Sequence, residues 1–245
     1  MENKRIRIGH LYPELLNLYG DTGNILTLKN RLLWRGIEAE VETIGKDSMI
    51  DFKNLDIVFL GGGSDREQLI VCHLLEQQKE SLSEYVESGG VLVAVCGGYQ
   101  LLGKTYPLDG QPVKGLGILD IETEVNDERL IGNVVICSGL LSKNELIVGF
   151  ENHAGRTRLG SCEPFGKVLT GYGNNGEDDT CGAVYKNVLG TYLHGPLLPK
   201  NPALADYLLE KALLRKYGEA ELLPLEDQAE KEAHQYAVKR FLKQS

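Results

Sequence analysis

A cysteine stands where the local chain would place a nucleophile. The segment Val91–Val95 is entirely apolar and predicts a strand buried on both faces, as in parallel sheets covered by helices. Cys96 follows that strand directly, and Gly97 and Gly98 lead into a helical segment. The pattern predicts a tight strand-to-helix turn that projects the sulfur from the carboxyl end of the sheet. A buried structural cysteine is the alternative interpretation of the same residue.

Two properties of this turn favour a reactive thiol. Strand and helix backbones approach closely at such a turn, and the small residues Ala94 and Gly98 stand two positions before and two positions after Cys96. The helix that starts near Gly97 points its positive end at the sulfur. We therefore expect a lowered thiol pKa and a favoured thiolate.

A glycine-rich turn can supply hydrogen-bond donors to the same place. Gly61, Gly62 and Gly63 follow the apolar run Ile57–Leu60, and such turns gather at the carboxyl edge of an open parallel sheet. Glycine amides there can join the Gly97 amide as an oxyanion hole. A plain strand-to-helix turn is the alternative, because three glycines alone do not exclude it.

A distant histidine is the candidate base. His194 ends a strand pattern in the run Thr191-Tyr-Leu-His-Gly-Pro196, and it lies 98 residues after Cys96 (194 − 96). Cysteine and histidine side chains that react together are usually brought together by the fold from distant parts of the chain. A core histidine with satisfied hydrogen bonds is the alternative.

These residues need a parallel sheet to position them, and the first half of the chain predicts one. Apolar runs alternate with helical spacing, with strands at 5–12, 37–44, 57–60 and 91–95 and helices at 24–35 and 65–87. This alternation is typical of an α/β fold with an open, mostly parallel sheet flanked by helices.

The second half is richer in strand patterns. They cover 130–136, 146–150, 167–170, 182–185 and 188–194, and two helices close the sequence at 202–217 and 226–243. No linker, repeat or low-complexity segment divides the sequence. We therefore expect one domain over residues 1–245.

Composition limits the kinds of partner. The net charge of −9, from 26 basic and 35 acidic side chains, argues against nucleic acid or anionic lipid. No apolar run is long enough for a membrane span, and the N-terminus lacks the apolar stretch of a signal peptide. The five cysteines include no CxxC pair, which argues against a metal site and favours a reduced cytoplasmic protein.

Together, the glycine turn, the Cys96-Gly-Gly-Tyr-Gln100 elbow and the Tyr192-Leu-His-Gly-Pro196 segment resemble the class I glutamine amidotransferases, which have a flavodoxin-like open sheet. The likeness is to the cobyric-acid-synthase-like subgroup in particular. Within it, residues 11–24 (LYPELLNLYGDTGN) are similar to the opening of the glutaminase subunits of lipid II isoglutaminyl synthase. The resemblance spans nearly the whole chain.

The resemblance implies a role for each matching residue. Cys96 would attack the side-chain amide of L-glutamine and form a γ-glutamyl thioester. His194 would protonate the leaving ammonia and then activate water. Gly62 and Gly97 would supply the oxyanion amides.

The resemblance also implies three residues around the reacting groups. Gln100 would contact the substrate, and Arg129 would hold the α-carboxylate of glutamine, which suits a guanidinium fork. Asp21 lies in the matching opening segment and would support the site. A solvated surface charge is the alternative for Arg129, and an ordinary turn aspartate is the alternative for Asp21.

In one respect the chain departs from the class. Many members carry an acidic residue two positions after the histidine, where this chain has Pro196. We therefore expect a Cys–His dyad in place of a triad. Glu151 and Asp21 are the candidates for a substitute acid.

The expected partner follows from a missing motif. The sequence has no GxxxxGK[ST] nucleotide loop, so we expect no cofactor on this chain, and ATP and Mg²⁺ only on a partner that uses the ammonia. The resemblance implies a heterodimer with a MurT-like Mur ligase subunit that amidates D-glutamate of lipid II. The alternatives are a cobyrinate-type ligase partner, a cysteine hydrolase of similar fold such as a peptidase or deglycase, and a catalytically silent interaction subunit.

Overall fold

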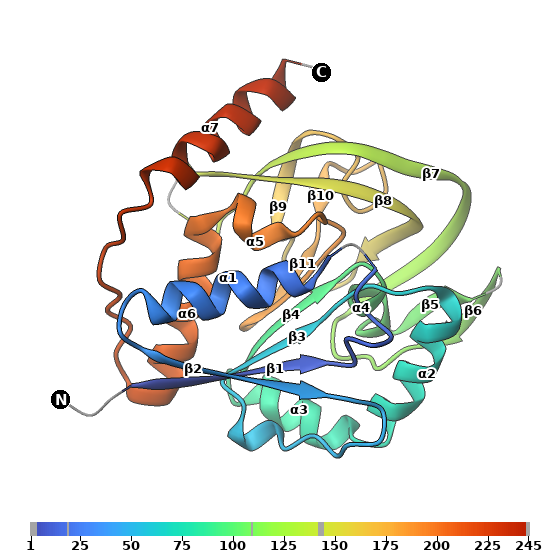
Figure 1. Ribbon diagram of the computed structural model, residues 1–245. Coiled ribbons are helices and arrows are strands. Elements are labelled where there is room, and N and C mark those ends of the chain that lie inside the picture. Colours follow the sequence, from blue (N-terminus) through green and yellow to red (C-terminus); the bar gives the residue numbers. More distant parts are fainter. Residues whose placement is uncertain (1–3, 19, 109, 142–144, 244–245) are drawn as a thin grey trace.

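The computed structural model describes residues 4–18, 20–108, 110–141 and 145–243, and its centre is a six-stranded sheet (Figure 1). The strand order is β11-β12-β4-β3-β1-β2, in which five strands run parallel and only the edge strand β11 is antiparallel. This arrangement confirms the predicted open, mostly parallel sheet. The bounds are β1 Arg5–Leu11, β2 Glu38–Ile44, β3 Ile57–Leu60, β4 Val91–Val95, β11 Ala183–Tyr185 and β12 Val188–Thr191.

Helices cover both faces of this sheet, which explains why β3 and β4 are apolar at every position and fully buried. One buried cluster joins the sheet to α1 (Thr22–Leu33), α5 (Leu197–Lys200) and α6 (Pro202–Tyr217). The opposite cluster joins it to α2 (Asp65–Glu76), α3 (Lys79–Glu87), α4 (Gly97–Leu101) and the short helix η1 (Phe52–Asn54).

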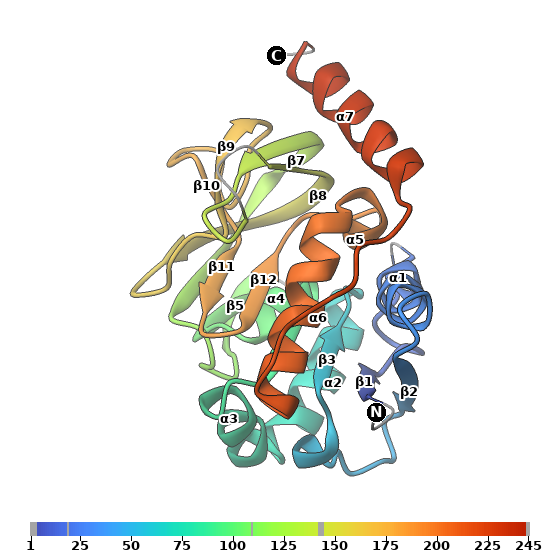
Figure 2. The same cartoon turned by 90° about the vertical axis from the view of Figure 1, so that its left-hand side faces the viewer.

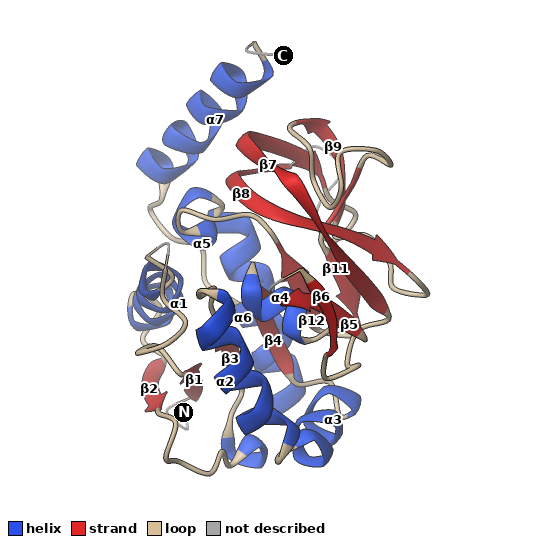
Figure 3. Ribbon diagram, turned by 90° about the vertical axis from the view of Figure 1, so that its right-hand side faces the viewer, coloured by secondary structure: helices blue, strands red, loops and turns tan. Residues whose placement is uncertain are grey.

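A second sheet is mainly antiparallel and has the order β10-β9-β7-β5-β6, with β8 paired to β7. Figure 3 shows β7 and β8 as long ribbons set apart from β1 and β2. Two bridges, Phe150–His194 and Glu163–Val184, tie it to the edge of the first sheet. The bounds are β5 Thr105–Leu108, β6 Gln111–Lys114, β7 Ile121–Cys137, β8 Leu146–Leu159, β9 Gly166–Thr170 and β10 Thr180–Cys181.

The predicted single helix over 65–87 is wrong, because the chain breaks it between α2 and α3. Gln78 lies at the break with φ −119° and ψ 16°, outside the helical region. Its buried side chain accepts the Ile50 N–H at 2.7 Å. This tertiary hydrogen bond fixes the break at Gln78. The helical pattern of polar and apolar residues continues on both sides of it, so the sequence does not reveal the break.

The last helix, α7 (Gln228–Leu242), projects from the body of the molecule (Figure 2). None of its described side chains is buried. The chain before it is anchored more firmly, because the buried Arg31 guanidinium binds Asp206 at 2.6 Å and Asp227 at 3.0 Å. Among the described helices, none is long and apolar enough to cross a membrane.

Candidate active site

The turn at Cys96 has the strained backbone that a strand–nucleophile–helix junction needs. Cys96 has φ 53° and ψ −110°, which a non-glycine residue adopts at a cost. Gly98 permits the turn, because a Cβ there would lie 2.7 Å from the carbonyl oxygens of Leu60 and Gly61. The structure therefore confirms the tight turn and the reason for a small residue two positions after the cysteine.

Three neighbouring strands end beside one another and carry the predicted groups. Gly62 follows β3, Cys96 follows β4, and His194 follows β12, and these strands are adjacent in the sheet. The Cys96 N–H donates to the Thr191 carbonyl at 2.8 Å. The His194 N–H donates to the Phe150 carbonyl at 2.7 Å. Parallel pairing thus brings residues from distant parts of the chain together at the carboxyl ends of the strands.

The expected depression of the thiol pKa is wrong. Burial of the largely buried Cys96 among protein atoms raises its pKa to about 12, and the charge of Asp21 contributes to this rise. A hydrogen bond from the Gly97 N–H lowers the pKa but does not offset the desolvation. The helix behind it, α4, has only five residues, so its dipole is a weak counterweight. The resting sulfur is a neutral thiol.

His194 is also neutral at rest. It is fully buried, and this desolvation, with the nearby charges of His153, Lys200 and Arg129, lowers its pKa to about 3. A neutral imidazole can accept a proton, and a neutral thiol can give one. The pair is therefore suited to general-base activation during attack, with the thiolate formed only as the new bond forms.

The glycine turn lies against the sulfur, and its amide is already engaged. A Cβ built on Gly62 would lie 3.7 Å from the Cys96 Sγ. The Gly62 N–H donates to the Asp21 carboxylate at 3.0 Å. Asp21 is fully buried, and burial raises its pKa to about 6. Asp21 thus touches one of the two predicted oxyanion donors directly.

Arg129 is an exposed residue of β7, which pairs with β8 in a long ribbon. It lies within the irregular register of β7 between Val125 and Leu130. Its guanidinium donates to the Asn152 side-chain and backbone oxygens, both at 2.8 Å. The exposed guanidinium is a minor influence on both reacting groups: after burial, which is the largest cause in each case, its charge acts to lower the pKa values of Cys96 and His194.

Gln100 is held in a buried polar network. Its side-chain amide donates to the Tyr192 hydroxyl at 3.1 Å, and that hydroxyl also shares a 2.7 Å hydrogen bond with Thr157. His153 stacks flat on the Tyr192 ring with centroids 3.7 Å apart. The predicted substrate contact of Gln100 stays a prediction, and the structure shows what fixes this side chain in place.

This network has a signature along β8 that we did not predict. Along β8, Glu151, His153, Gly155 and Thr157 are buried at alternate positions. Buried polar residues with the period of a strand indicate a polar core or site.

Glu151, one candidate for the substitute acid, already accepts two backbone hydrogen bonds. Its carboxylate accepts the N–H groups of Tyr172 at 2.7 Å and Gly173 at 2.9 Å, and it lies 3.6 Å from His153 Nε2. Pro196 forms the start of α5. The role of Glu151 or Asp21 as an acid that orients His194 stays a prediction.

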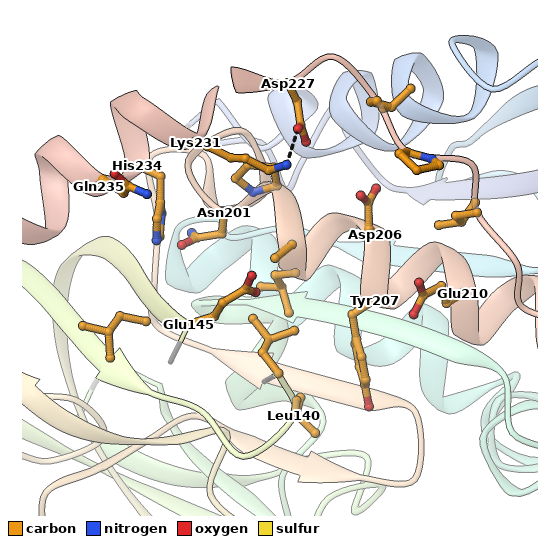
Figure 4. Close-up of a pocket in the computed structure, with 18 of the residues that line it drawn as sticks. Leu140, Glu145, Asn201, Asp206, Tyr207, Glu210, Asp227, Lys231, His234 and Gln235 are labelled. Carbon is orange, nitrogen blue, oxygen red and sulfur yellow. Dashed lines mark ion pairs between the residues drawn. The ribbon is translucent and has the colours of Figure 1, made fainter. Parts of the chain in front are cut away.

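A separate pocket of about 680 Å³ lies between α6, α7 and the chain that joins them (Figure 4). Tyr207, His234 and Leu140 are among its lining residues, and no predicted site residue is. Among the described residues, no group of three or more His, Cys, Asp or Glu side chains could hold a metal ion.

The fold and this edge of the sheet define the class. Residues 7–202 match the CobB/CobQ-like glutamine amidotransferase domain, and the chain belongs to that family. It is 46% identical over 240 residues to the lipid II isoglutaminyl synthase (glutamine-hydrolyzing) subunit GatD of Staphylococcus aureus, covering 98% of this chain and 97% of that one. It is 42% identical to the subunit of the same name from Streptococcus pneumoniae, covering 90% and 85%.

Other relatives are more distant. Cobyric acid synthase of Listeria innocua is 34% identical over 159 residues, which cover 60% of this chain and only 30% of the synthase. A solved glutamine amidotransferase has a TM-score of 0.54 at 23% identity, covering 84% of this chain and 98% of that one. The glutaminase domain of Trypanosoma brucei CTPS with bound acivicin has a TM-score of 0.51 at 13% identity, covering 89% and 96%. These two solved structures support the fold alone.

Proposed function

We propose that this chain is the glutamine-hydrolysing subunit of a lipid II isoglutaminyl synthase, acting in the cytoplasm with a MurT-like ligase. The observation that carries the activity is the adjacency of Gly62, Cys96 and His194 at the ends of three neighbouring strands. Near-full-length identity to the two GatD subunits supports the acceptor. The short match to cobyric acid synthase gives the cobyrinate-type alternative less support.

In the proposed reaction, the Cys96 sulfur attacks the side-chain carbonyl carbon of glutamine while His194 takes the thiol proton. The carbonyl oxygen becomes an oxyanion that the Gly62 and Gly97 amides bind. Collapse breaks the C–N bond, and His194 returns its proton to the leaving ammonia. Water then attacks the γ-glutamyl thioester with His194 as base, which yields glutamate and restores the thiol.

Arg129 would hold the α-carboxylate of glutamine in this reaction. Its exposed guanidinium, held by Asn152, suits a charge that meets the substrate end remote from the amide. Gln100 supports the same pocket from behind the elbow through Tyr192.

The ammonia then serves the ligase, which would activate the α-carboxyl of D-glutamate in the lipid II stem peptide with ATP. A test compares amidation of lipid II by the complex with glutamine and, separately, with an ammonium salt as nitrogen source. We expect Cys96→Ala to abolish the glutamine-dependent reaction and to leave the ammonium-dependent reaction intact. Full glutamine-dependent activity in this variant would refute the assignment.

The other cysteines provide matched controls. Cys72, Cys137, Cys162 and Cys181 do not stand at a strand–helix elbow, so their alanine variants should keep glutamine-dependent amidation. A cysteine hydrolase of similar fold would act without glutamine. Covalent labelling of Cys96 by a glutamine-like electrophile, and its suppression by free glutamine, separates these two functions.

A further inference from the structure

The backbone of the glycine turn is hydrogen-bonded on both sides of Gly62. On one side its N–H donates to Asp21 at 3.0 Å, and on the other its carbonyl accepts the Leu18 N–H at 3.0 Å. The Gly61 carbonyl accepts the Gly98 N–H at 3.1 Å. Both bonds at Gly62 come from the connection between β1 and α1, so this connection fixes the orientation of the candidate oxyanion donor.

The Asp21 carboxylate accepts the Gly62 N–H, the same donor that a substrate oxyanion would need. It is fully buried, and its second oxygen, Oδ1, has no hydrogen-bond partner among the described residues. Its accepting oxygen is packed so closely that a Cβ on Gly61 would lie 2.8 Å from it. A buried carboxylate with so few donors depends strongly on the Gly62 N–H.

The two anions exclude each other. One N–H can make one strong, linear hydrogen bond, and a substrate oxyanion at Gly62 would meet a second negative oxygen already there. The charge of Asp21 also disfavours a thiolate at Cys96. The arrangement therefore opposes both the attacking group and the tetrahedral intermediate.

We propose that Asp21 is a positioning residue that withholds the Gly62 amide from the reaction in the isolated chain and releases it when the ligase subunit binds. This inference rests on the proposed function. Release needs only a shift of the β1–α1 connection, in which Leu18 is 59% exposed and accessible to a partner. The device keeps glutamine from being hydrolysed where no acceptor is ready for the ammonia.

The test measures kcat and KM for glutamine hydrolysis by the isolated chain and by its complex with the ligase. For the isolated chain, we expect Asp21→Ala to raise kcat by about tenfold or more, the factor by which a hydrogen bond to a charged group holds its donor. The glutamine KM should stay unchanged. Asp21→Asn should raise kcat less, because its amide oxygen still accepts the N–H but carries no charge.

Asp56→Asn is the matched control. Asp56 precedes β3, the strand that ends at the glycine turn, and its buried carboxylate also accepts a backbone N–H, that of Arg7 at 2.7 Å. Because it lies at the opposite end of the strand, its replacement should change stability without changing the ratio of complex to isolated activity. A merely structural role for Asp21 would give the same result as this control.

The outcomes are distinct. If the wild-type complex hydrolyses no glutamine, the proposed function fails, whatever Asp21 does. If the complex is active and both Asp21 variants lower or leave unchanged the kcat of the isolated chain, the withholding role is wrong. Should the variants not fold, the wild-type chain labelled with ¹⁵N-glycine decides. We expect the Gly62 amide resonance to move when the ligase binds, and an unmoved resonance in an active complex overturns the proposal.

Discussion

At the scale of single residues, the candidate nucleophile and base are both neutral at rest. This differs from cysteine enzymes that store a thiolate–imidazolium pair, and it follows from burial, which outweighs the Gly97 hydrogen bond at Cys96. The proton therefore has to move during the reaction. Substrate binding has to supply the stabilisation that the resting site lacks.

The alkylation of Cys96 should reveal this neutral thiol. Because its pKa is about 12, the thiolate fraction rises tenfold with each unit of pH, and the rate with iodoacetamide should do the same between about pH 6 and 9. Mass spectrometry of the Cys96 peptide after short pulses measures the rate. The exposed Cys137 serves as the internal reference for reagent. A rate that is already constant near neutral pH would show a preformed thiolate.

Replacement of Arg129 by alanine should weaken glutamine binding. The loss of a charge-assisted contact to the α-carboxylate costs about 1.5–3 kcal/mol, which should appear mainly as a higher glutamine KM. Steady-state hydrolysis by the complex measures it. Arg158→Ala is the control. Arg158 is also exposed but lies on β8, the partner strand of β7, and binds Glu177 at 2.9 Å. Equal kcat/KM for the Arg129 variant and the wild type would place this residue outside the pocket.

At the scale of elements, Gly155 of β8 packs against the polar network of Gln100 and Tyr192 that follows the Cys96 turn. A Cβ on Gly155 would lie 2.4 Å from the Gln100 side-chain nitrogen and 2.7 Å from the Tyr192 hydroxyl. Gly155 is thus the place where the second sheet packs against the residues that support Cys96. Only a residue without a side chain allows both hydrogen-bonding groups to meet there.

The substitution Gly155→Ala should therefore destabilise the fold and misplace Gln100. Overpacking of this kind costs about 1–3 kcal/mol, and we expect a melting temperature lower by several degrees together with reduced glutaminase activity. Differential scanning calorimetry and steady-state kinetics measure the two effects. Gly139→Ala is the control, because a Cβ at Gly139 meets nothing within 4 Å. Identical melting temperatures for the two variants would contradict this packing.

The elements show where sequence patterns succeed and where they fail. Val91–Val95 and the Cys96 turn were predictable because a run of apolar residues before Cys-Gly-Gly has few other structures. The lengths of β7 and β8 were not, because charged residues at 122–129 hide a strand that pairs through its backbone. The bond between Asp21 and Gly62 joins residues 41 positions apart, and no local pattern encodes it.

At the scale of the whole molecule, α7 lies outside the buried core. Its described side chains are not buried, and its tie to α5 includes a 2.7 Å bond between His234 and the Lys200 carbonyl. The buried ion pairs of Arg31 involve Asp206 and Asp227, which precede the helix. The hydrophobic core ends before α7 begins.

A chain that ends after Asp227 should therefore fold and keep its glutaminase chemistry. We expect its melting temperature to fall by less than about 4 °C, since no buried side chain is lost. Arg31→Ala in the full chain is the comparison. It removes a buried guanidinium that binds two carboxylates, which then keep only Arg35 and Lys231, and it should lower the melting temperature more. A truncated chain that fails to fold would make α7 part of the core.

The path of the chain between β4 and β12 has a consequence for how such proteins diversify. These strands are neighbours in the first sheet, yet β5 to β10 all lie between them in the sequence. The second sheet is therefore an insertion in the first. The chain leaves the first sheet after β4 and returns to it at β11, and both of these strands pair with β12. Changes in its outer loops would leave the pairing of β4 with β12, and so the adjacency of Cys96 and His194, unaltered. Arg129 belongs to this insertion, whereas Cys96 and His194 follow strands of the first sheet. If Arg129 binds the substrate as proposed, substrate choice and cleavage chemistry lie on separate parts of the fold.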